Sequence, residues 1–171
     1  MTKIISLREL KKIRNDKKKI GLCHGVFDVV HYGHLKHLIE AKNKVDILVL
    51  SITTDKYVNK APHLPINSHN SRAKFLLHFK FIDYIFINNN ETSENIIKIL
   101  KPNFYFKGAD YKKKDITGNL KKEIKVLKHN GGEFLITNTQ LMSSTKISNN
   151  LLLDWSLDKK KILSNLSKNK S

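Results

Sequence analysis

The sequence is poor in cysteine, and this limits how the chain can be cross-linked. Cys23 is the single cysteine among 171 residues, so no disulfide can form within the chain. It lies in a short apolar run, 19–23, where a thiol usually acts as a small core residue. We therefore expect Cys23 to be a core residue rather than a reactive or metal-binding one.

Long apolar runs and metal-binding spacings are also missing. No run reaches the roughly 20 residues that span a bilayer, and residues 1–19 lack the uninterrupted apolar centre of a signal peptide. The sequence thus predicts a cytoplasmic protein without membrane insertion. Metal-ligand spacing is absent among six histidines, namely His24, His37, His63, His69, His78 and His129. No metal held by the protein alone is expected.

Acidic residues are few, with 15 Asp and Glu against 32 Lys and Arg, and the formal net charge is +17. Such a charge suggests nucleic-acid binding. However, the lysines are scattered along every segment, and no RNP-type or zinc-finger pattern accompanies them. We assign the charge mainly to solvated surface and expect no specific nucleic-acid partner.

The most informative stretch is GVFDVVHYGH, residues 25–34. It follows the strand-like run 19–23 and precedes residues 35–42, whose apolar positions have helical spacing. A helix N-terminus exposes unpaired backbone N–H groups and favours phosphate. His31 and His34 lie three residues apart on one face of this helix start, where imidazole donors can stabilise charge on a phosphoryl group.

This stretch resembles the GxFDxxHxGH signature of the nucleotidylyltransferase superfamily, in its cytidylyltransferase-like branch. The resemblance implies a single Rossmann-like α/β domain with a central parallel sheet and helices on both faces. It also implies transfer of a nucleoside monophosphate from a nucleoside triphosphate to a phosphorylated small molecule, with release of pyrophosphate. His31 and His34 would be catalytic. The nucleotide-binding residues of the stretch would be Gly25, Val26, Phe27, Asp28 and Gly33.

The rest of the chain alternates between strand-like and helix-like patterns, which predicts further right-handed βαβ units. The expected strands are residues 45–52, 82–87, 103–106 and 133–137, and the expected helices are 6–18, 33–44, 72–79, 94–100 and 120–129. Asn130-Gly131-Gly132 is expected to stop the last of these helices at a left-handed cap. The stretch 112–122 is too polar to lie in the core and is well placed for a mobile flap, a question that the sequence leaves open.

Two cations near a polar loop, 56–69, match the family pattern. Ligands of open parallel sheets bind beyond the carboxyl ends of the strands, so this loop is expected on the side of the site. The resemblance places Arg72 near the triphosphate or the acceptor phosphate. Lys60 resembles the lysine that precedes this proline-containing loop in relatives. Both are predicted to be catalytic by neutralising phosphates.

Two later segments also resemble family elements. KGADY, 107–111, is similar to the KGGDY of heptose-phosphate adenylyltransferases and to the GDDW of glycerol-phosphate cytidylyltransferases, although Ala109 replaces their glycine or aspartate. This likeness assigns Lys107, Gly108 and Asp110 to nucleotide binding. The segment 142–147 resembles the ISSTxI or STTKI element that faces the HxGH loop across the nucleotide. Ser143, Ser144 and Thr145 are predicted to hold the β- and γ-phosphates, and Met142 is assigned to nucleotide binding with them.

The predicted reaction is attack of an acceptor phosphate oxygen on the α-phosphate of the triphosphate. Mg²⁺ is expected to enter bound to that triphosphate. A sugar- or polyol-phosphate acceptor with CTP is narrowly favoured. An ATP-dependent enzyme of the heptose-phosphate type is the alternative. A catalytically inactive basic module that binds nucleotides or nucleic acid is the alternative of another class.

The resemblance divides the chain into a nucleotidylyltransferase domain, 1–150, and a C-terminal part, 151–171. The C-terminal part is predicted to be an amphipathic helix, 151–166, followed by a short disordered tail. This helix is expected either to pack within the subunit or to line a subunit interface, and a homodimer is expected.

Overall fold

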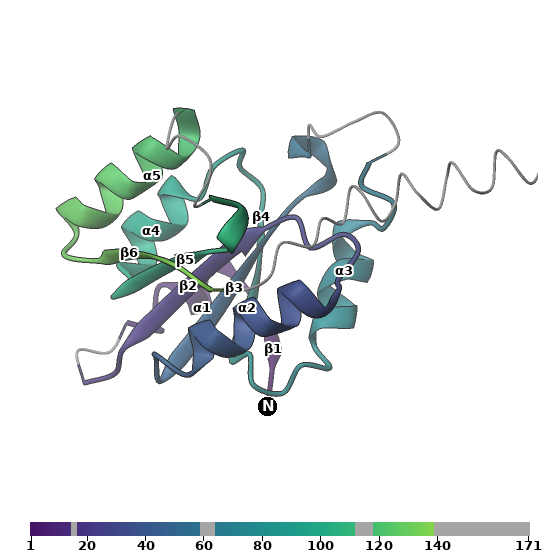
Figure 1. The fold of residues 1–171 in the computed structure, drawn as a ribbon, viewed down its shortest axis with the longest axis horizontal. Coiled ribbons are helices and arrows are strands. Elements are labelled where there is room, and N and C mark those ends of the chain that lie inside the picture. Colours follow the sequence, from purple (N-terminus) through teal and green to yellow (C-terminus); the bar gives the residue numbers. More distant parts are fainter. Residues whose placement is uncertain (15–16, 59–63, 112–117, 139–171) are drawn as a thin grey trace, which may run out of the picture. The chain divides into compact units, whose positions relative to one another are not determined.

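The computed structural model describes residues 1–14, 17–58, 64–111 and 118–138, which belong to one compact unit, Met1–Leu141. Their strands form one parallel sheet in the order β1-β4-β3-β2-β5-β6 (Figure 1). The strands are β1 (Lys3–Ile5), β2 (Ile20–Gly25), β3 (Ile47–Thr53), β4 (Tyr84–Asn88), β5 (Phe104–Lys107) and β6 (Glu133–Ile136). The helices are α1 (Leu7–Leu10), α2 (Tyr32–Lys42), α3 (His69–Leu76), α4 (Glu94–Leu100) and α5 (Gly118–His129), with 3-10 turns η1 (Asp55–Tyr57) and η2 (Ala109–Tyr111).

Helices cover both faces of the sheet. One layer is formed by α2 and α3, and its core includes Leu38, Leu50 and Leu76. The opposite layer is formed by α1, α4 and α5, and its core includes Val49 and Ile97. Neighbouring residues of β3 point to opposite layers because side chains alternate along a strand. This architecture confirms the predicted Rossmann-like α/β domain.

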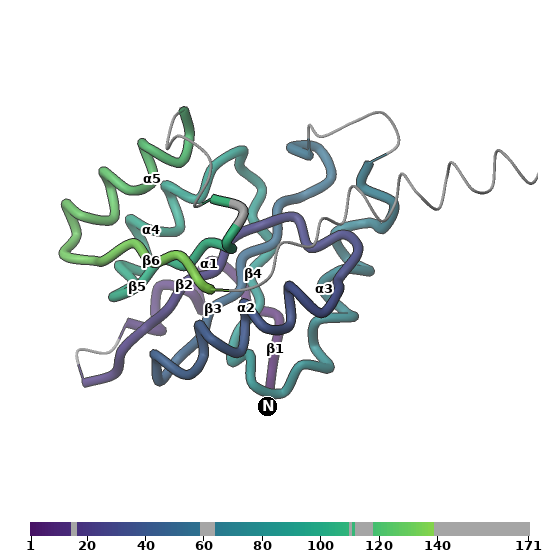
Figure 2. The backbone as a smooth tube through the Cα atoms, viewed as in Figure 1, coloured from purple at the N-terminus to yellow at the C-terminus, as the bar shows by residue number. Residues whose placement is uncertain are grey.

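The order of the strands reverses at β2. The chain runs outward from β2 through β3 to β4, then returns to place β5 and β6 on the other side of β2 (Figure 2). Cys23 of β2 pairs with Leu50 of β3 and with Phe106 of β5, so it lies buried in the middle of the sheet, as expected. Ligands of such sheets bind at the carboxyl edge near this reversal.

The N-terminal segment differs from the prediction of a helix over 6–18. Lys3–Ile5 forms an edge strand parallel to β4, and the helix that follows spans only Leu7–Leu10. Ser6 caps this helix as expected, and its backbone N–H donates to the Glu9 carboxylate at 2.8 Å. The helix ends early because Ile13 is the only apolar residue between positions 11 and 18, so a longer helix has no face to bury.

Other element bounds shift by a few residues. The third helix begins at His69 rather than at Arg72, because the Ser68 hydroxyl caps it by accepting the Ser71 N–H at 3.2 Å. Residues 118–122 belong to α5, and residues 112–117 lie outside the described ranges. Gly131 has φ +78°, which confirms the left-handed stop after α5. Within the described ranges, the helices are too short or too polar to cross a bilayer.

Candidate active site

The glycine loop that follows β2 ends at an unusual helix cap. His31 is the N-cap of α2, and its Nδ1 accepts the Gly33 N–H at 3.1 Å. The Nδ1 of His34 accepts the His31 N–H at 3.4 Å, and the two ring centroids lie 4.1 Å apart. Because both Nδ1 atoms act as acceptors, each neutral ring carries its proton on Nε2. The cap therefore sets two imidazoles side by side, each with a donor at Nε2.

Phe27 shapes the loop before this cap. Its φ is +52°, a left-handed conformation that residues other than glycine rarely adopt. The Phe27 ring lies 5.5 Å from the His34 ring and packs over Gly25, where an added Cβ would meet it at 3.1 Å. Gly25 is thus needed for the close approach of a side chain.

Asp28 binds a segment from elsewhere in the chain. Its carboxylate accepts the backbone N–H of Ile66 at 2.7 Å and that of Asn67 at 2.8 Å. The Asn67 side chain also donates to the Asp28 carbonyl oxygen at 3.2 Å. These bonds attach the signature loop to the residues that lead into α3, whereas the sequence predicts that Asp28 binds nucleotide.

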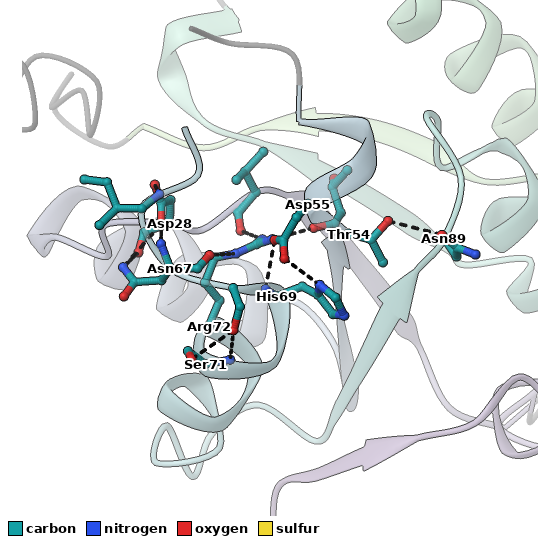
Figure 3. Close-up of polar contacts among 12 residues, drawn as sticks. Asp28, Thr54, Asp55, Asn67, His69, Ser71, Arg72 and Asn89 are labelled. Atoms are coloured by element: carbon teal, nitrogen blue, oxygen red, sulfur yellow. Dashed lines mark hydrogen bonds and ion pairs between the residues drawn. The ribbon is translucent and has the colours of Figure 1, made fainter. Parts of the chain in front are cut away.

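Arg72 also bonds to the protein itself (Figure 3). Its side chain is 0% exposed, and its guanidinium donates to the carbonyl oxygens of Val26, Thr53 and Asn67 and to the Asp55 carboxylate at 2.6 Å. Burial favours a raised pKa for Asp55, but the hydrogen bonds from Arg72 and from His69 outweigh it and lower the pKa below its ordinary value. Arg72 is thus a buried cation paired with a partly exposed carboxylate.

Lys107 ends β5 beside the signature strand. It is buried, its Nζ donates to the His24 carbonyl oxygen at 3.1 Å, and it lies over the rings of Tyr105 and Tyr111 at 5.2 Å each. Burial, reinforced by the Lys107 charge, lowers the pKa of His24 to about 3, so that ring is neutral near pH 7. The KGADY segment thus brings a fixed cation to the carboxyl edge of the sheet.

A cleft of about 280 Å³ opens at this edge, where β2, β3 and β5 end. Its lining includes Lys107, the phenols of Tyr57 and Tyr111, and the polar side chains of Glu91 and Asn119. A second cleft, of about 260 Å³, lies between residues 27–30 and α3. The loop between β2 and α2 contributes Val26 to the first cleft and residues 27–30 to the second, whereas His31 and His34 are not among the residues that line these two clefts.

Comparison with known protein families decides the class. The family described as "Cytidylyltransferase-like" matches residues 22–150, which is most of the chain. The chain belongs to this family. The match includes the signature loop, the Arg72 helix and the KGADY segment, and it supports nucleotidyl transfer as the class of reaction.

Two curated relatives of this cytidylyltransferase-like protein share a name. "Bifunctional protein HldE" of Campylobacter fetus is 37% identical over 128 residues, which cover 73% of this chain and 28% of that protein. "Bifunctional protein HldE" of Aliarcobacter butzleri is 34% identical over 142 residues, which cover 81% of this chain and 30% of that protein. The chain therefore spans less than a third of the length of these relatives.

Solved structures share the fold of this cytidylyltransferase-like protein. The lipopolysaccharide core biosynthesis protein of Thermoplasma volcanium has a TM-score of 0.59 at 22% identity, covering 72% of this chain and 99% of its own. Pantoate-beta-alanine ligase of Francisella tularensis has a TM-score of 0.58 at 17% identity, covering 84% and 69%. At these identities the likeness shows the fold alone.

Several predicted site residues of this family member lie outside the described ranges, namely Lys60, Met142, Ser143, Ser144 and Thr145. So does the predicted helix 151–166. Gly108 accepts the Tyr111 N–H at 3.1 Å and closes the turn η2, in which Asp110 also lies. Their assignment to nucleotide binding stays a prediction.

Sequence reasoning missed the residues that hold the loop. Asp55 pairs with Arg72, and it also accepts the backbone N–H and the Nδ1–H of His69 at 2.9 and 2.8 Å. Asn67 joins Asp28 to Arg72. One signal was available, because a carboxylate shortly after a strand, as Asp55 is after β3, lies at the edge where ligands bind.

Proposed function

We propose that this chain transfers a nucleoside monophosphate from a nucleoside triphosphate, with ATP as the donor, to the phosphate group of a sugar. The observation that carries the proposal is the histidine pair at the start of α2. Both rings accept a backbone N–H at Nδ1, which leaves the proton of each neutral ring on Nε2. Two such donors at a helix N-terminus suit a phosphoryl group on which negative charge develops.

The reaction needs little covalent help from the protein. An oxygen of the sugar phosphate attacks the α-phosphorus in line, the new P–O bond forms, and the bond to pyrophosphate breaks. The nucleophile is already an oxyanion, so no general base is required. His31 and His34 donate hydrogen bonds to the phosphoryl oxygens, and Lys60 neutralises phosphate charge.

Mg²⁺ is proposed to enter with the triphosphate, where it supplies charge neutralisation of the phosphate oxygens. Within the described ranges, no three His, Cys, Asp or Glu side chains gather as a metal site. This residue set fits a cation held mainly by phosphate oxygens and water. Ser143, Ser144 and Thr145 are proposed to hold the β- and γ-phosphates.

The cleft beside Lys107 supports a sugar phosphate as the acceptor. Glu91 and Asn119 line it, and carboxylate and amide groups are the usual partners of sugar hydroxyls. Lys107 brings positive charge to the same cleft, which suits a phosphate.

Two similarities favour ATP over CTP. KGADY resembles the KGGDY of heptose-phosphate adenylyltransferases, and the curated relatives reported above carry the name HldE. The narrow preference for CTP predicted from the sequence has no support among those relatives. A heptose phosphate is therefore the acceptor that we propose to test first.

Pyrophosphate release tests the proposal. The full chain is incubated with ATP or CTP, with Mg²⁺, and with each of a set of heptose, hexose and polyol phosphates. We expect release with ATP and a sugar phosphate, loss of release in His34→Ala, and unchanged release in His78→Ala, which alters an exposed histidine. Turnover with CTP alone would refute the donor assignment. Salt-sensitive binding of oligonucleotides without any turnover would instead support the inactive binding module.

A homodimer remains a separate proposal. The chain has a mass of 19.8 kDa, so sedimentation equilibrium is expected to give about twice that value for the dimer. A single species at the mass of one chain, at the concentrations used for the assay, would refute it.

A further inference from the structure

The strained loop that carries the signature is held on both sides of Phe27. Phe27 has φ +52°, and this conformation persists in proteins only where the surroundings enforce it. On one side, the Val26 carbonyl oxygen accepts from Arg72. On the other side, the Asp28 carboxylate accepts the N–H groups of Ile66 and Asn67.

These two attachments join into one closed network (Figure 3). The Nε of Arg72 donates to the Asn67 carbonyl oxygen at 3.0 Å, while the Asn67 N–H donates to Asp28 at 2.8 Å. Residues 26 and 28 are thus tied to the same short segment, 66–72. A shift of that segment therefore moves both ends of the Phe27 turn.

Asp55 fixes the segment to the sheet. It lies two residues after the end of β3 and accepts from the Arg72 guanidinium at 2.6 Å. It also accepts both the backbone N–H and the ring Nδ1–H of His69, the first residue of α3. Arg72 also donates to the Thr53 carbonyl oxygen at 2.8 Å. A fully buried guanidinium needs such a counter-charge, so removal of Asp55 leaves Arg72 poorly satisfied.

We propose that Asp55 and Arg72 are positioning residues, which hold the signature loop so that His31 and His34 meet the reacting phosphate, without touching a substrate themselves. This inference rests on the proposed function, but it departs from the predicted role of Arg72 in phosphate binding. Four of the five N–H donors of the guanidinium go to protein acceptors, and the Arg72 side chain is 0% exposed. The residues therefore act through the loop.

Steady-state kinetics of Asp55→Asn, Arg72→Lys and the double variant test this inference. Asp83→Asn is the matched control, because Asp83 also accepts from a cation, Lys42, and from a backbone N–H, but precedes β4 at the opposite edge of the sheet. We expect kcat to fall about 10- to 100-fold in Asp55→Asn, since small misplacement of reacting groups has costs of that order, with both KM values nearly unchanged. We expect the same fall in kcat in Arg72→Lys. The kcat of the double variant should be no lower than that of either single variant, and Asp83→Asn should keep the wild-type kcat.

A second measurement remains informative if the chain turns over none of the tested substrates. Imidazole ¹⁵N spectra of the free protein report which nitrogen of each histidine carries the proton. We expect Nε2–H tautomers for His31 and His34 in the wild type and in Asp83→Asn, and mixed tautomers in Asp55→Asn.

Two results would overturn the inference. One is a rise in the KM for the triphosphate at constant kcat in Arg72→Lys, because that pattern belongs to a residue that binds phosphate directly. The other is wild-type spectra and wild-type kcat in Asp55→Asn. If Arg72→Lys does not fold, as judged by urea unfolding, the near-isosteric Asp55→Asn decides alone. A wild type that turns over none of the tested substrates would count against the proposed function. The positioning role would still be supported if the wild type showed Nε2–H tautomers and Asp55→Asn showed mixed tautomers.

Discussion

Replacement of His31 by asparagine separates its two roles. As the N-cap, its Nδ1 accepts the Gly33 N–H, and as the proposed catalyst its Nε2–H donates to the reacting phosphate. Asparagine is among the best N-cap residues, but its short side chain cannot replace the remote donor. His31→Asn therefore preserves the cap and removes the catalyst, whereas His31→Ala removes both.

The magnitudes of the two effects differ enough to be measured apart. Loss of an N-cap costs about 1 kcal/mol, which lowers Tm by roughly 2–4 °C in a chain of this size. Loss of a donor to the transition state costs about 100- to 1,000-fold in kcat. We expect His31→Ala to show both losses and His31→Asn to show only the second.

Thermal unfolding and pyrophosphate release on the same samples give the comparison. Ser6→Ala serves as a control, because it removes a similar cap from α1, the helix that follows the edge strand β1. It is expected to lower Tm by a similar amount and to leave kcat unchanged. If His31→Asn retains turnover within about threefold of the wild type, the imidazole is not the donor and the mechanism is wrong.

Three further predictions concern single side chains, Tyr105, Asp55 and Cys23. Tyr105→Phe removes a hydroxyl that donates to the buried Glu123 carboxylate at 2.9 Å, and we expect urea unfolding to show a loss of about 1.5–3 kcal/mol. The pKa of Asp55 is lowered in the folded protein, so its charge stabilises the fold above the unfolded pKa of about 3.9. This contribution is lost as the pH falls through the native pKa. Urea unfolding should therefore show that the difference in unfolding free energy between wild type and Asp55→Asn shrinks in acid. Burial raises the pKa of Cys23, so iodoacetamide should label the folded protein far more slowly than the protein in denaturant, and equal rates would contradict its place in the core.

The fold was predictable wherever a continuous run of residues carried a clear pattern of apolar positions. Residues 45–52 form an apolar, β-branched run, and β3 spans Ile47–Thr53. The strand β1 escaped prediction because three residues carry too little pattern, and the cap signal at Ser6 favoured a helix there. Its place beside β4 depends on pairing across 81 residues between Lys3 and Tyr84. Short edge strands are defined by tertiary contacts that periodicity does not encode.

The site was predictable only in part, for a similar reason. The histidine pair belongs to a continuous strand, turn and helix, so its spacing is visible in the sequence. The acceptors of Arg72 come from residues 26, 53, 55 and 67, and no spacing rule relates them to one another. A buried arginine and a surface arginine also look alike in a sequence. Its protein contacts therefore became visible only in three dimensions.

The burial of Lys107 has a consequence for selectivity in salt. The many surface lysines attract any polyanion, and counterions weaken that attraction beyond about 8 Å at physiological ionic strength. Lys107 is buried against two aromatic rings and lines the cleft, so its attraction to an anion in contact with it is screened much less than attraction between exposed charges. Raising the salt concentration should thus strip away adventitious RNA and DNA while the electrostatic pull on an anion seated in the cleft persists. The cell's own electrolyte would then sharpen the choice of ligand.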